Sequence, residues 1–506
     1  MYLPDCVQEF KEPCTEIRLI KGTYYKYEVR YQYSKEKKRT EKKTVRLLGK
    51  IIEDVGFVPS DKDRIRRKSE ELPNVDIKTY GLYYLFNDLL SEEIVSLKEV
   101  FSEETVEKLL SFSMMRWAYQ SPIKRAVRYH AHDYCSQYWS KGSLSDKQIS
   151  QALKHVGQNR EVVVNWMRSL LGVPEEMENT YLMMDSTHTP SHSDKLSINA
   201  KGYNPSFDFD KQLRLMYLFS SKLKQPVYYR LINGNITDIK SMSLCVKELG
   251  VDNVIFIADK GFFSQENIDL LDQQNLQYII PLRRNNPLID YSLLLKANPK
   301  KEIGNYFSYQ DRIIWYYQFE KEGKKLITFL DEKLRVEEET DYLRRIQTMP
   351  EKYTKKDYFE KLHTFGTLTM VHKIKKKTNQ KRKQKKECTP NEIYETYKQR
   401  NEIEVMFDSY KNYLDADVTY MQDRYVLEGW LFANFIAMIA YYKLFSRLKQ
   451  AQLLGKYSPK DIIELSKTIH MIKIRGTWNL SEITEKTGKI FKKIGIDYLK
   501  VCEVTD

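Results

Sequence analysis

Residues 254–259 read Val254-Ile255-Phe256-Ile257-Ala258-Asp259, an uninterrupted apolar run that stops at a carboxylate. A short apolar run bounded by polar residues predicts a buried strand. Open α/β sheets expose their functional side chains at the carboxyl ends of such strands. Asp259 is therefore the first candidate for chemistry in this chain.

The same pattern repeats on both sides of this strand. Further strands are expected at residues 181–184, 213–219, 226–232 and 277–282. Helices are expected at residues 238–249 and, after the capping residue Ser264, to about residue 274. Three strands, a helix, a strand, a helix and a strand predict an α/β layer with mixed strand directions. This order matches that of the ribonuclease H core.

Residues 397–411, YKQRNEIEVMFDSYK, read as a helix further along the chain. On a period of 3.6 residues, Tyr397, Arg400, Glu404 and Lys411 fall within roughly 60° of one another and form one polar stripe. A charged face exposed to solvent is the usual explanation of such a stripe. A functional role is the alternative, and it depends on what else the chain supplies.

Two carboxylates follow predicted strands, Asp185 after residues 181–184 and Asp259 after residues 254–258. Each alone is more often a turn or cap residue. Together with Glu404 they supply three carboxylates from three elements, a set that suits hard divalent cations. Two such cations can flank a scissile phosphate, one activating the attacking water or 3′-hydroxyl and the other stabilising the leaving oxygen.

Other polar residues compete with these three. Glu402 points about 200° away from Glu404 on a helix and so lies off the stripe. Asp408 is one turn beyond Glu404, where a local salt bridge is expected. Three aspartates lie in a polar loop without a strand end to fix them: Asp194, Asp208 and Asp210. His188 and His192 lie near Asp185, where support of a metal ligand is an alternative to the default of a loop histidine with no metal role.

Composition narrows the class of partner. The 506 residues are long enough for two to four domains, and the formal net charge is +14. This excess favours an anionic partner, with nucleic acid first and an anionic membrane surface second, whereas plain solubility is the neutral explanation. Six scattered cysteines without a CxxC or Cys/His cluster fit a reducing cytoplasm better than disulfides or a zinc site. The most apolar stretch, residues 430–440, is too short to span a bilayer and predicts a buried core helix.

The N-terminal region predicts a small antiparallel sheet. Residues 25–33 alternate tyrosine and valine with charged or polar residues, and their neighbours are expected at 17–20 and 44–48. The connection at residues 34–43 is a strongly basic hairpin, for which a solvated loop and a contact with DNA both stay open. A second basic tract, residues 373–386, precedes the 397–411 helix, and a contact with phosphates is preferred there over a solvated loop.

Helical periodicity dominates residues 80–173. A DNA-reading helix-turn-helix is an alternative there to an ordinary structural bundle. The expected segments are a basic β domain with a possible role in DNA binding at 1–72, a helical subdomain at 73–178, an α/β core at 179–284 and 390–450, a mainly β, basic insertion at 285–389, and a helical C-terminal region at 451–506.

Several motifs between residues 185 and 411 resemble those of a known family. Tyr397-x2-Arg400-x3-Glu404-x6-Lys411 reproduces the Y-x2-R-x3-E-x6-K signature of a large group of bacterial insertion-sequence transposases. Residues 259–264, DKGFFS, look like the group's D-x-G-[FY]-x-S motif around the second catalytic aspartate. Residues 185–187 look like the first aspartate motif, and residues 234–238, GNITD, resemble the G-N-x-x-D segment between them.

The resemblance implies a DDE transposase with a ribonuclease H-like, mixed-sheet catalytic core that a mainly β insertion interrupts. It implies that Asp185, Asp259 and Glu404 are catalytic and bind two Mg²⁺ or Mn²⁺ ions. It also implies that Tyr397, Arg400 and Lys411 contact DNA phosphates. Some relatives stack a flipped base on an aromatic of the insertion; Trp315 is the candidate, although a core tryptophan is the usual reading.

The implied partners are double-stranded DNA, as transposon ends and target, and a second copy of the chain on DNA, with no membrane. The implied location is the bacterial cytoplasm, at the nucleoid when DNA is bound. Two other functions remain open: a DNA-binding protein descended from such an enzyme that no longer cleaves, and a metal-dependent nuclease on the same core.

Overall fold

The computed structural model describes residues 3–34, 39–53, 55–61, 75–139, 144–172, 180–202, 211–251, 254–374, 377–379, 384–386, 388–416 and 419–498. The chain forms two compact units. The first comprises Met1–Lys78 with His470–Ser481, and the second comprises Thr79–Ile469 with Glu482–Asp506. Residues 62–74 and parts of the basic segments 34–43 and 373–386 lie outside the described residues.

The first unit contains a four-stranded antiparallel sheet whose strands are neighbours in chain order. Its elements are α1 (Asp5–Gln8), β1 (Thr15–Ile20), β2 (Thr23–Ser34), β3 (Arg39–Ile52) and β4 (Gly56–Pro59). The strand predicted at residues 25–33 lies within β2, and its predicted partners lie in β1 and β3. The predicted N-terminal antiparallel sheet is therefore present.

A three-stranded sheet corrects the expectation of an entirely helical C-terminal region. It joins β5 (Asp76–Thr79) to the hairpin of β18 (His470–Ile474) and β19 (Thr477–Leu480) in the order β19-β18-β5. Arg475 and Gly476 form the two-residue turn, both with positive φ, at 52° and 96°. Two positive φ angles give the turn a twist that matches that of a hairpin. Asn-Gly is a common sequence signal for such a turn, whereas Arg-Gly is not.

Helices make up most of residues 81–169, as the periodicity predicted. They are α3 (Gly81–Leu89), α4 (Ser91–Val100), α5 (Glu103–Tyr119), α6 (Ile123–His132), η1 (Tyr134–Gln137), α7 (Asp146–Gln158) and α8 (Arg160–Ser169). Ser145 caps α7 as predicted, because its hydroxyl accepts from the Gln148 N–H while the Gln148 side chain accepts from the Ser145 N–H.

The predicted α/β layer is a mixed sheet. Its elements are β6 (Thr180–Pro190), β7 (Ala200–Lys201), β8 (Lys211–Ser220), β9 (Gln225–Asn233), α10 (Asp238–Leu249), β10 (Val254–Ala258), η3 (Lys260–Phe262), α11 (Gln265–Gln273) and β11 (Gln277–Pro281). β10 runs parallel to both β6 and β11, whereas β8 is antiparallel to β6 and to β9. The central order is therefore β11-β10-β6-β8-β9, and the mixed strand directions are confirmed.

Residues 285–389 extend this sheet and add helices to it. The elements are α12 (Pro299–Ile303), β12 (Asn305–Tyr309), β13 (Arg312–Lys321), β14 (Lys324–Asp331), α13 (Glu332–Thr348), α14 (Lys355–Lys361), η4 (Leu362–Thr364), β15 (Thr367–Lys373), β16 (Lys377–Asn379) and β17 (Gln384–Lys386). β15 pairs with β11, so β12 to β15 continue the same sheet. The expectation of a mainly β segment is wrong for α13, a 17-residue helix with no buried residue and hence no apolar face to reveal it.

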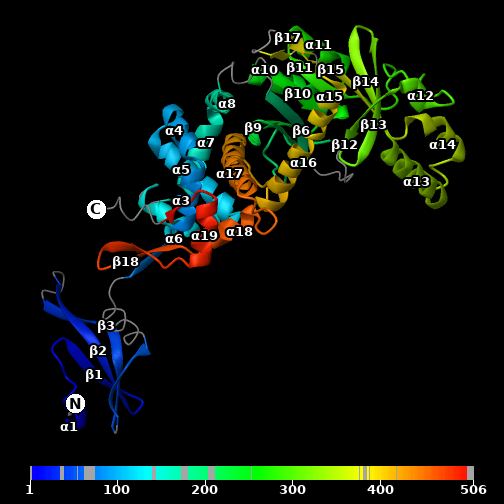
Figure 1. Ribbon diagram of the computed structural model, residues 1–506. Helices are drawn as coiled ribbons and strands as arrows, with labels where there is room; N and C mark the ends of the chain where they lie inside the picture. The colour runs from blue at the N-terminus through cyan, green and yellow to red at the C-terminus, as the bar shows by residue number, and fades with distance from the viewer. Residues whose placement is uncertain are drawn as a thin grey trace. The chain divides into compact units, whose positions relative to one another are not determined.

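The remaining helices follow the sheet in the chain. They are α15 (Pro390–Lys398), α16 (Asn401–Asp408), the π-helix η5 (Ser409–Tyr413), α17 (Arg424–Gln450), α18 (Pro459–Ser466) and α19 (Glu485–Lys493). Figure 1 shows α15 and α16, in yellow and orange, running beside the green strands. The predicted core helix at residues 430–440 lies in α17 and is buried throughout. Among the described helices, none has both the length and the apolar character that crossing a membrane requires.

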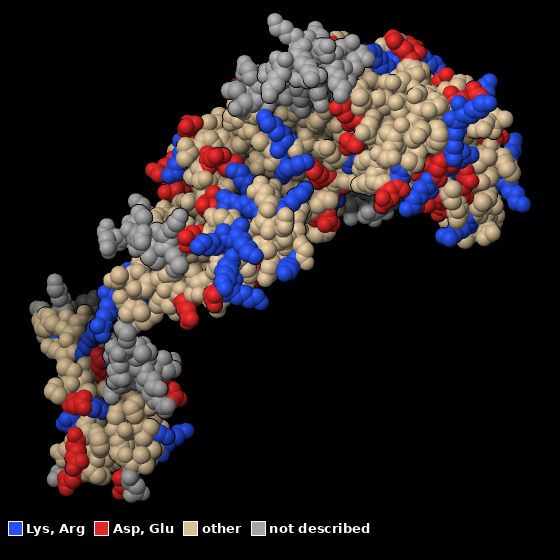
Figure 2. All heavy atoms as spheres, viewed as in Figure 1, with Lys and Arg blue, Asp and Glu red and all other residues tan. Residues whose placement is uncertain are grey.

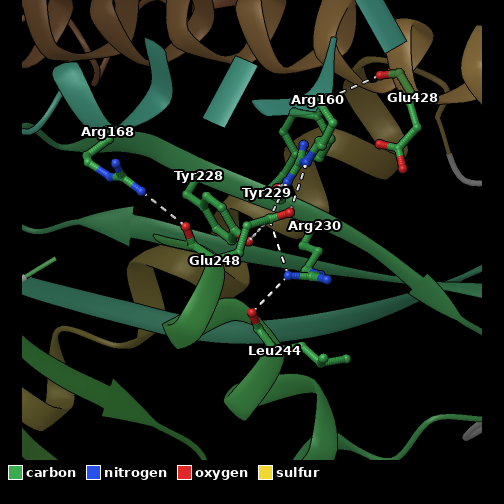
Figure 3. Close-up of polar contacts among 8 residues, drawn as sticks. All are labelled: Arg160, Arg168, Tyr228, Tyr229, Arg230, Leu244, Glu248 and Glu428. Atoms are coloured by element: carbon green, nitrogen blue, oxygen red, sulfur yellow. Dashed lines mark hydrogen bonds and ion pairs between the residues drawn. The ribbon is translucent and has the colours of Figure 1, made fainter. Parts of the chain in front are cut away.

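A buried polar network joins the helices to the sheet (Figure 3). Arg160, at the start of α8, donates to the Glu248 carboxylate of α10 at 2.9 Å and to the Tyr229 carbonyl of β9 at 2.6 Å. Arg168 donates to the Glu248 carbonyl at 3.2 Å, and the Tyr229 hydroxyl donates to the Glu428 carbonyl of α17 at 3.1 Å. These bonds tie α8, α10 and α17 to the strand β9.

Candidate active site

The register of two strands places Asp185 beside Asp259. β6 and β10 pair in parallel from Thr180 opposite Val254 to Met184 opposite Ala258, so the next residues along both strands are the two aspartates. The expectation that the first strand ends at Met184 is wrong, because β6 continues to Pro190 against β8. The apolar run stops at residue 184, but the hydrogen-bonded ladder to β8 does not.

The predicted 397–411 helix is interrupted. α15 ends at Lys398 and α16 begins at Asn401, although Gln399 and Arg400 keep right-handed helical φ and ψ angles. The N–H groups of Arg400 and Glu402 donate to the carbonyls three residues earlier, which tightens this turn. No glycine or proline marks the break, so the sequence carried no signal for it. Lys411 lies beyond α16 in the wider turns of η5.

Arg116 of α5 fixes the end of this segment. Its side chain is buried and donates to the Leu414 and Asp415 carbonyls, which follow η5, and to Asn434 Oδ1 of α17 at 2.9 Å. A buried guanidinium surrounded by acceptors holds the chain in one place, because withdrawing any acceptor would leave a buried donor unpaired.

Three carboxylates converge on the Arg400 guanidinium. Arg400 Nη2 lies 3.0 Å from Asp185 Oδ2, while Nη1 lies 2.9 Å from Glu404 Oε1 and 3.9 Å from Asp259 Oδ1. Arg400 is the most buried of the four side chains, with 13% exposed, and Glu404 is the least, with 54% exposed. The structure thus brings the three predicted carboxylates, from two strand positions and a helix, around one cation.

Burial dominates the electrostatics of this cluster. It raises the pKa of the Asp185 carboxyl to about 6, although the Arg400 charge acts in the opposite direction. Burial also raises the pKa of the Tyr397 hydroxyl to about 12, so Tyr397 is a neutral donor at physiological pH. Burial lowers the pKa of the His188 imidazole to about 4, and the nearby charges of Arg214 and then Lys411 act in the same direction.

The donor set fits a hard divalent cation. All three side chains offer carboxylate oxygens, and all three already face one positive charge. Among the residues that the structure describes, no group of three or more His, Cys, Asp or Glu side chains is gathered closely enough to hold a metal without rearrangement. Arg400 stands between them, and metal binding by Asp185, Asp259 and Glu404 stays a prediction.

The competing acids lie elsewhere. Glu402 forms an ion pair with Lys224 at 2.8 Å, away from the three carboxylates, as its position off the stripe predicted. Asp408 accepts a hydrogen bond from Asn412 at 2.5 Å and not the expected salt bridge. His188 belongs to β6 and not to a loop, whereas Asp208 and Asp210 lie outside the described residues.

Trp315 is a packing residue in this structure. It lies in β13 and packs against a buried cluster that includes Tyr317 and Leu330, with its ring 5.1 Å from that of Tyr306. Trp315 is only partly buried, and a role in base stacking stays a prediction.

Sequence reasoning missed a polar network beside Asp185. The Ser186 N–H donates to Asp185 Oδ1 at 2.8 Å, and the Ser186 hydroxyl donates to Asp238 Oδ1 at 2.7 Å. Arg214 Nη1 donates to the same Asp238 oxygen and to the Ser186 hydroxyl, the latter at 3.3 Å. Only the GNITD segment, which ends on Asp238, pointed to this residue, and nothing in the sequence pointed to Arg214.

The net positive charge does not mark the site by itself. On the face shown in Figure 2, Lys and Arg side chains are interspersed with Asp and Glu over the described residues. The basic tract at residues 373–386 includes the short strands β16 and β17, and its other residues lie largely outside the described part. Contacts with DNA by Tyr397, Arg400 and Lys411 stay predictions.

Comparison with known proteins gives a family. Residues 178–440 match the family described as "Transposase DDE domain". Among solved structures, the chain is similar to a piggyBac transposase synaptic complex with hairpin DNA, with 11% identity, a TM-score of 0.36, and coverage of 76% of this chain and 79% of that one. It is also similar to the Mos1 transposase paired-end complex with the left transposon end, with 11% identity, a TM-score of 0.15, and coverage of 32% and 54%. A comparison with curated proteins found no match. The match to the family spans more than half of the chain and contains Asp185, Asp259 and Glu404, and the chain therefore belongs to the DDE transposase domain family.

Proposed function

We propose that this chain is the transposase of a bacterial insertion sequence, which binds terminal inverted repeats and catalyses metal-dependent DNA strand cleavage and strand transfer. The observation that carries the proposal is the convergence of Asp185, Asp259 and Glu404 on the Arg400 guanidinium. A protein that only bound DNA would have no use for three carboxylates directed at one point, because each of them repels phosphate.

The topology supports a ribonuclease H-like core. The spatial order is β11-β10-β6-β8-β9, with β6, β10 and β11 parallel and β8 reversed, which is consistent with the mixed strand directions expected of that core. Residues 285–389 act as an insertion in this proposal, since they enter after β11 and return before α15. The core is then completed by α15, α16 and α17.

DDE transposases generally use divalent metal ions. Asp185, Asp259 and Glu404 would hold Mg²⁺ or Mn²⁺, which supplies activation of the attacking water or 3′-hydroxyl and stabilisation of the leaving oxygen. In this proposal Arg400 exchanges its carboxylate partners for phosphate oxygens when DNA binds, a bidentate contact that a guanidinium makes well. Tyr397 and Lys411 contribute further phosphate donors from the same segment.

The proposed partners follow from the reaction. Cleavage and joining require double-stranded DNA both as transposon end and as target. Synapsis of two ends calls for two copies of the chain on DNA. We place this activity in the bacterial cytoplasm, at the nucleoid when DNA is bound.

A cleavage assay tests the proposal. Labelled duplexes that carry each end of the encoding element are incubated with the protein and Mg²⁺, comparing wild type, Glu404→Ala and Glu402→Ala. Glu402 is the matched control, because it is an acid on the same helix that pairs with Lys224 away from the site. We expect nicking and joined products with wild type and Glu402→Ala, and binding without nicking with Glu404→Ala.

The same assay separates the alternatives. If the wild-type protein binds these ends but never nicks them, the result would support the alternative of a DNA-binding protein without cleavage activity. Nicking without any joined product would favour the nuclease.

A further inference from the structure

Asp185 receives support from the face of the sheet opposite to Glu404. Asp185 lies opposite Tyr217 in the β6–β8 ladder, and the Tyr217 ring lies 5.8 Å from Phe407 of α16 and 5.7 Å from Tyr410 of η5. Successive strand residues alternate between faces, so Ser186 lies on the other face. That second face is where α10 begins, with Asp238 as its first residue.

The Asp238 carboxylate lies between strand β6 and the turn that follows Asp259. Its Oδ1 accepts from the Ser186 hydroxyl of β6 at 2.7 Å. Its Oδ2 faces the turn after β10, since a Cβ atom placed on Gly261 would lie 3.4 Å from it. Gly261 is two residues beyond Asp259, and Asp238 thus lies between the Asp185 strand and the Asp259 turn.

A buried cation holds this carboxylate in place. The Arg214 side chain is only 7% exposed and donates from Nη1 both to Asp238 Oδ1 and to the Ser186 hydroxyl. Because a buried guanidinium is costly without a partner, Arg214 restrains Asp238 to this position. Ser186 in turn donates its backbone N–H to Asp185 Oδ1 at 2.8 Å.

We propose that Asp238, held by Arg214, is a positioning residue that fixes the Asp185 carboxylate through Ser186. The inference rests on the proposed function, in which Asp185 holds a metal ion. Orientation of the ligand matters because a carboxylate that rotates away must be reordered each time the metal binds. Asp238 touches neither substrate nor metal in this arrangement and acts only through Ser186.

Three variants test the chain of contacts. Ser186→Ala removes the hydroxyl, Ser186→Thr keeps it on a residue suited to a strand, and Asp238→Asn keeps the shape but removes the charge. Ser243→Ala is the matched control, because Ser243 is an exposed hydroxyl on the same helix α10 that donates only to the Lys240 carbonyl, at 3.0 Å. Thermal unfolding of each variant checks that it is folded.

Three quantities are measured: Mn²⁺ affinity of the DNA-free protein by calorimetry, affinity for a terminal duplex in EDTA, and the single-turnover cleavage rate. We expect Ser186→Ala and Asp238→Asn to lower both Mn²⁺ affinity and cleavage rate by about tenfold to a hundredfold, the usual cost of losing a partner of a metal ligand. Affinity for DNA should stay unchanged. Ser186→Thr should behave as wild type, and so should Ser243→Ala.

Ser186→Ala with wild-type Mn²⁺ affinity and cleavage rate would overturn the inference. So would a parallel loss of DNA affinity in Ser186→Ala, since that would place the defect in the fold at large. Wild type that bound Mn²⁺ but never cut DNA would defeat the proposed function, while the Mn²⁺ affinities of the variants would still decide the positioning role. Wild type that bound no Mn²⁺ would overturn both.

Discussion

Arg400 lies among three carboxylates and offsets part of their mutual repulsion. Three carboxylates that face one point repel one another, and in a partly buried setting each such repulsion is worth more than in water. The guanidinium contacts two of them at hydrogen-bonding distance and the third at 3.9 Å. A divalent cation bound by the same oxygens would have to displace it, so the arginine and the metal compete.

Removing this competitor should tighten metal binding in the absence of DNA. We expect Arg400→Gln to raise Mn²⁺ affinity about tenfold, which corresponds to about 1.4 kcal/mol. The same variant should bind duplex DNA more weakly, because it loses a phosphate donor. Calorimetric Mn²⁺ titration checks the first effect, with Lys224→Gln as a control that removes a cation from the Glu402 side of the helix. Unchanged or weaker Mn²⁺ binding by Arg400→Gln would show that the arginine does not compete.

Metal binding should also depend on pH through Asp185. Its pKa is raised to about 6 by burial, and only the ionised carboxylate binds metal. Above that pH the Asp185 carboxylate is ionised and can bind metal, whereas below it the carboxyl must first lose a proton. Mn²⁺ affinity should therefore fall as the pH drops through 6. Mn²⁺ titrations from about pH 5 to about pH 8 measure this directly. A flat profile across that range would mean that Asp185 is ionised throughout.

Among the elements, α7 and α17 cross at backbone contact. A Cβ atom on Gly157 of α7 would lie 1.9 Å from the Tyr425 carbonyl oxygen, and one on Gly429 of α17 would lie 2.0 Å from the Leu153 carbonyl oxygen. No side chain fits at either distance. Glycine normally weakens a helix interior. At these two positions its lack of a side chain allows the helices to cross closely.

Alanine at this crossing should destabilise the protein. We expect Gly429→Ala to lower the free energy of unfolding by about 1–3 kcal/mol, the cost of forcing extra atoms into a packed interior. Gly488→Ala is the matched control, since Gly488 lies in α19 with nothing within 4 Å of its Cβ position. There the substitution should stabilise the helix by up to about 1 kcal/mol. Denaturant unfolding of both variants provides the comparison, and equal effects would contradict the close crossing.

Elements with an apolar pattern could be predicted from the sequence, and elements held by other means could not. Residues 180–282 alternate short apolar runs with turns, and each predicted strand and helix is present there, although β6 ends at Pro190 instead of Met184. α13 has no buried residue and therefore no apolar face that the sequence could show. The β18–β19 hairpin turns at Arg475 and Gly476, a pair that is not a common turn signal.

The candidate site divides in the same way. Its three carboxylates stood after apolar runs or on a polar stripe, where sequence patterns are informative. The Asp238 contact to Ser186 joins residues 52 positions apart through hydrogen bonds, which no periodicity encodes.

On the scale of the whole molecule, the first unit carries the basic hairpin for which a solvated loop and a contact with DNA both stayed open. β1 pairs with β2 only as far as Glu28, and β4 pairs with β3 only as far as Gly49. From Arg30 opposite Lys43 to Ser34 opposite Arg39, β2 and β3 form a two-stranded ribbon. Tyr31 and Tyr33 on this ribbon are 62% and 60% exposed. A ribbon of this width is one that the DNA major groove admits.

Salt dependence tests this role. Arg30 and Lys43 are exposed on this ribbon. If both contact phosphates, the double variant Arg30→Gln/Lys43→Gln should lower the slope of log affinity against log salt by about 2. Anisotropy titrations with a terminal duplex in EDTA measure the slope. The double variant Lys11→Gln/Lys50→Gln removes two exposed cations of the same unit outside the ribbon, and an equal loss there would assign the effect to net charge alone.

The division of the chain has a consequence during synthesis. β5 is translated early, but its sheet partners β18 and β19 emerge from the ribosome only after the whole of the mixed sheet and α17. The three-stranded sheet therefore closes after translation of residue 480, whatever the rest of the first unit has done by then. Ribosome-bound chains that stop before residue 470 should carry β5 without its hairpin, so any activity that requires this sheet begins only after the hairpin has closed.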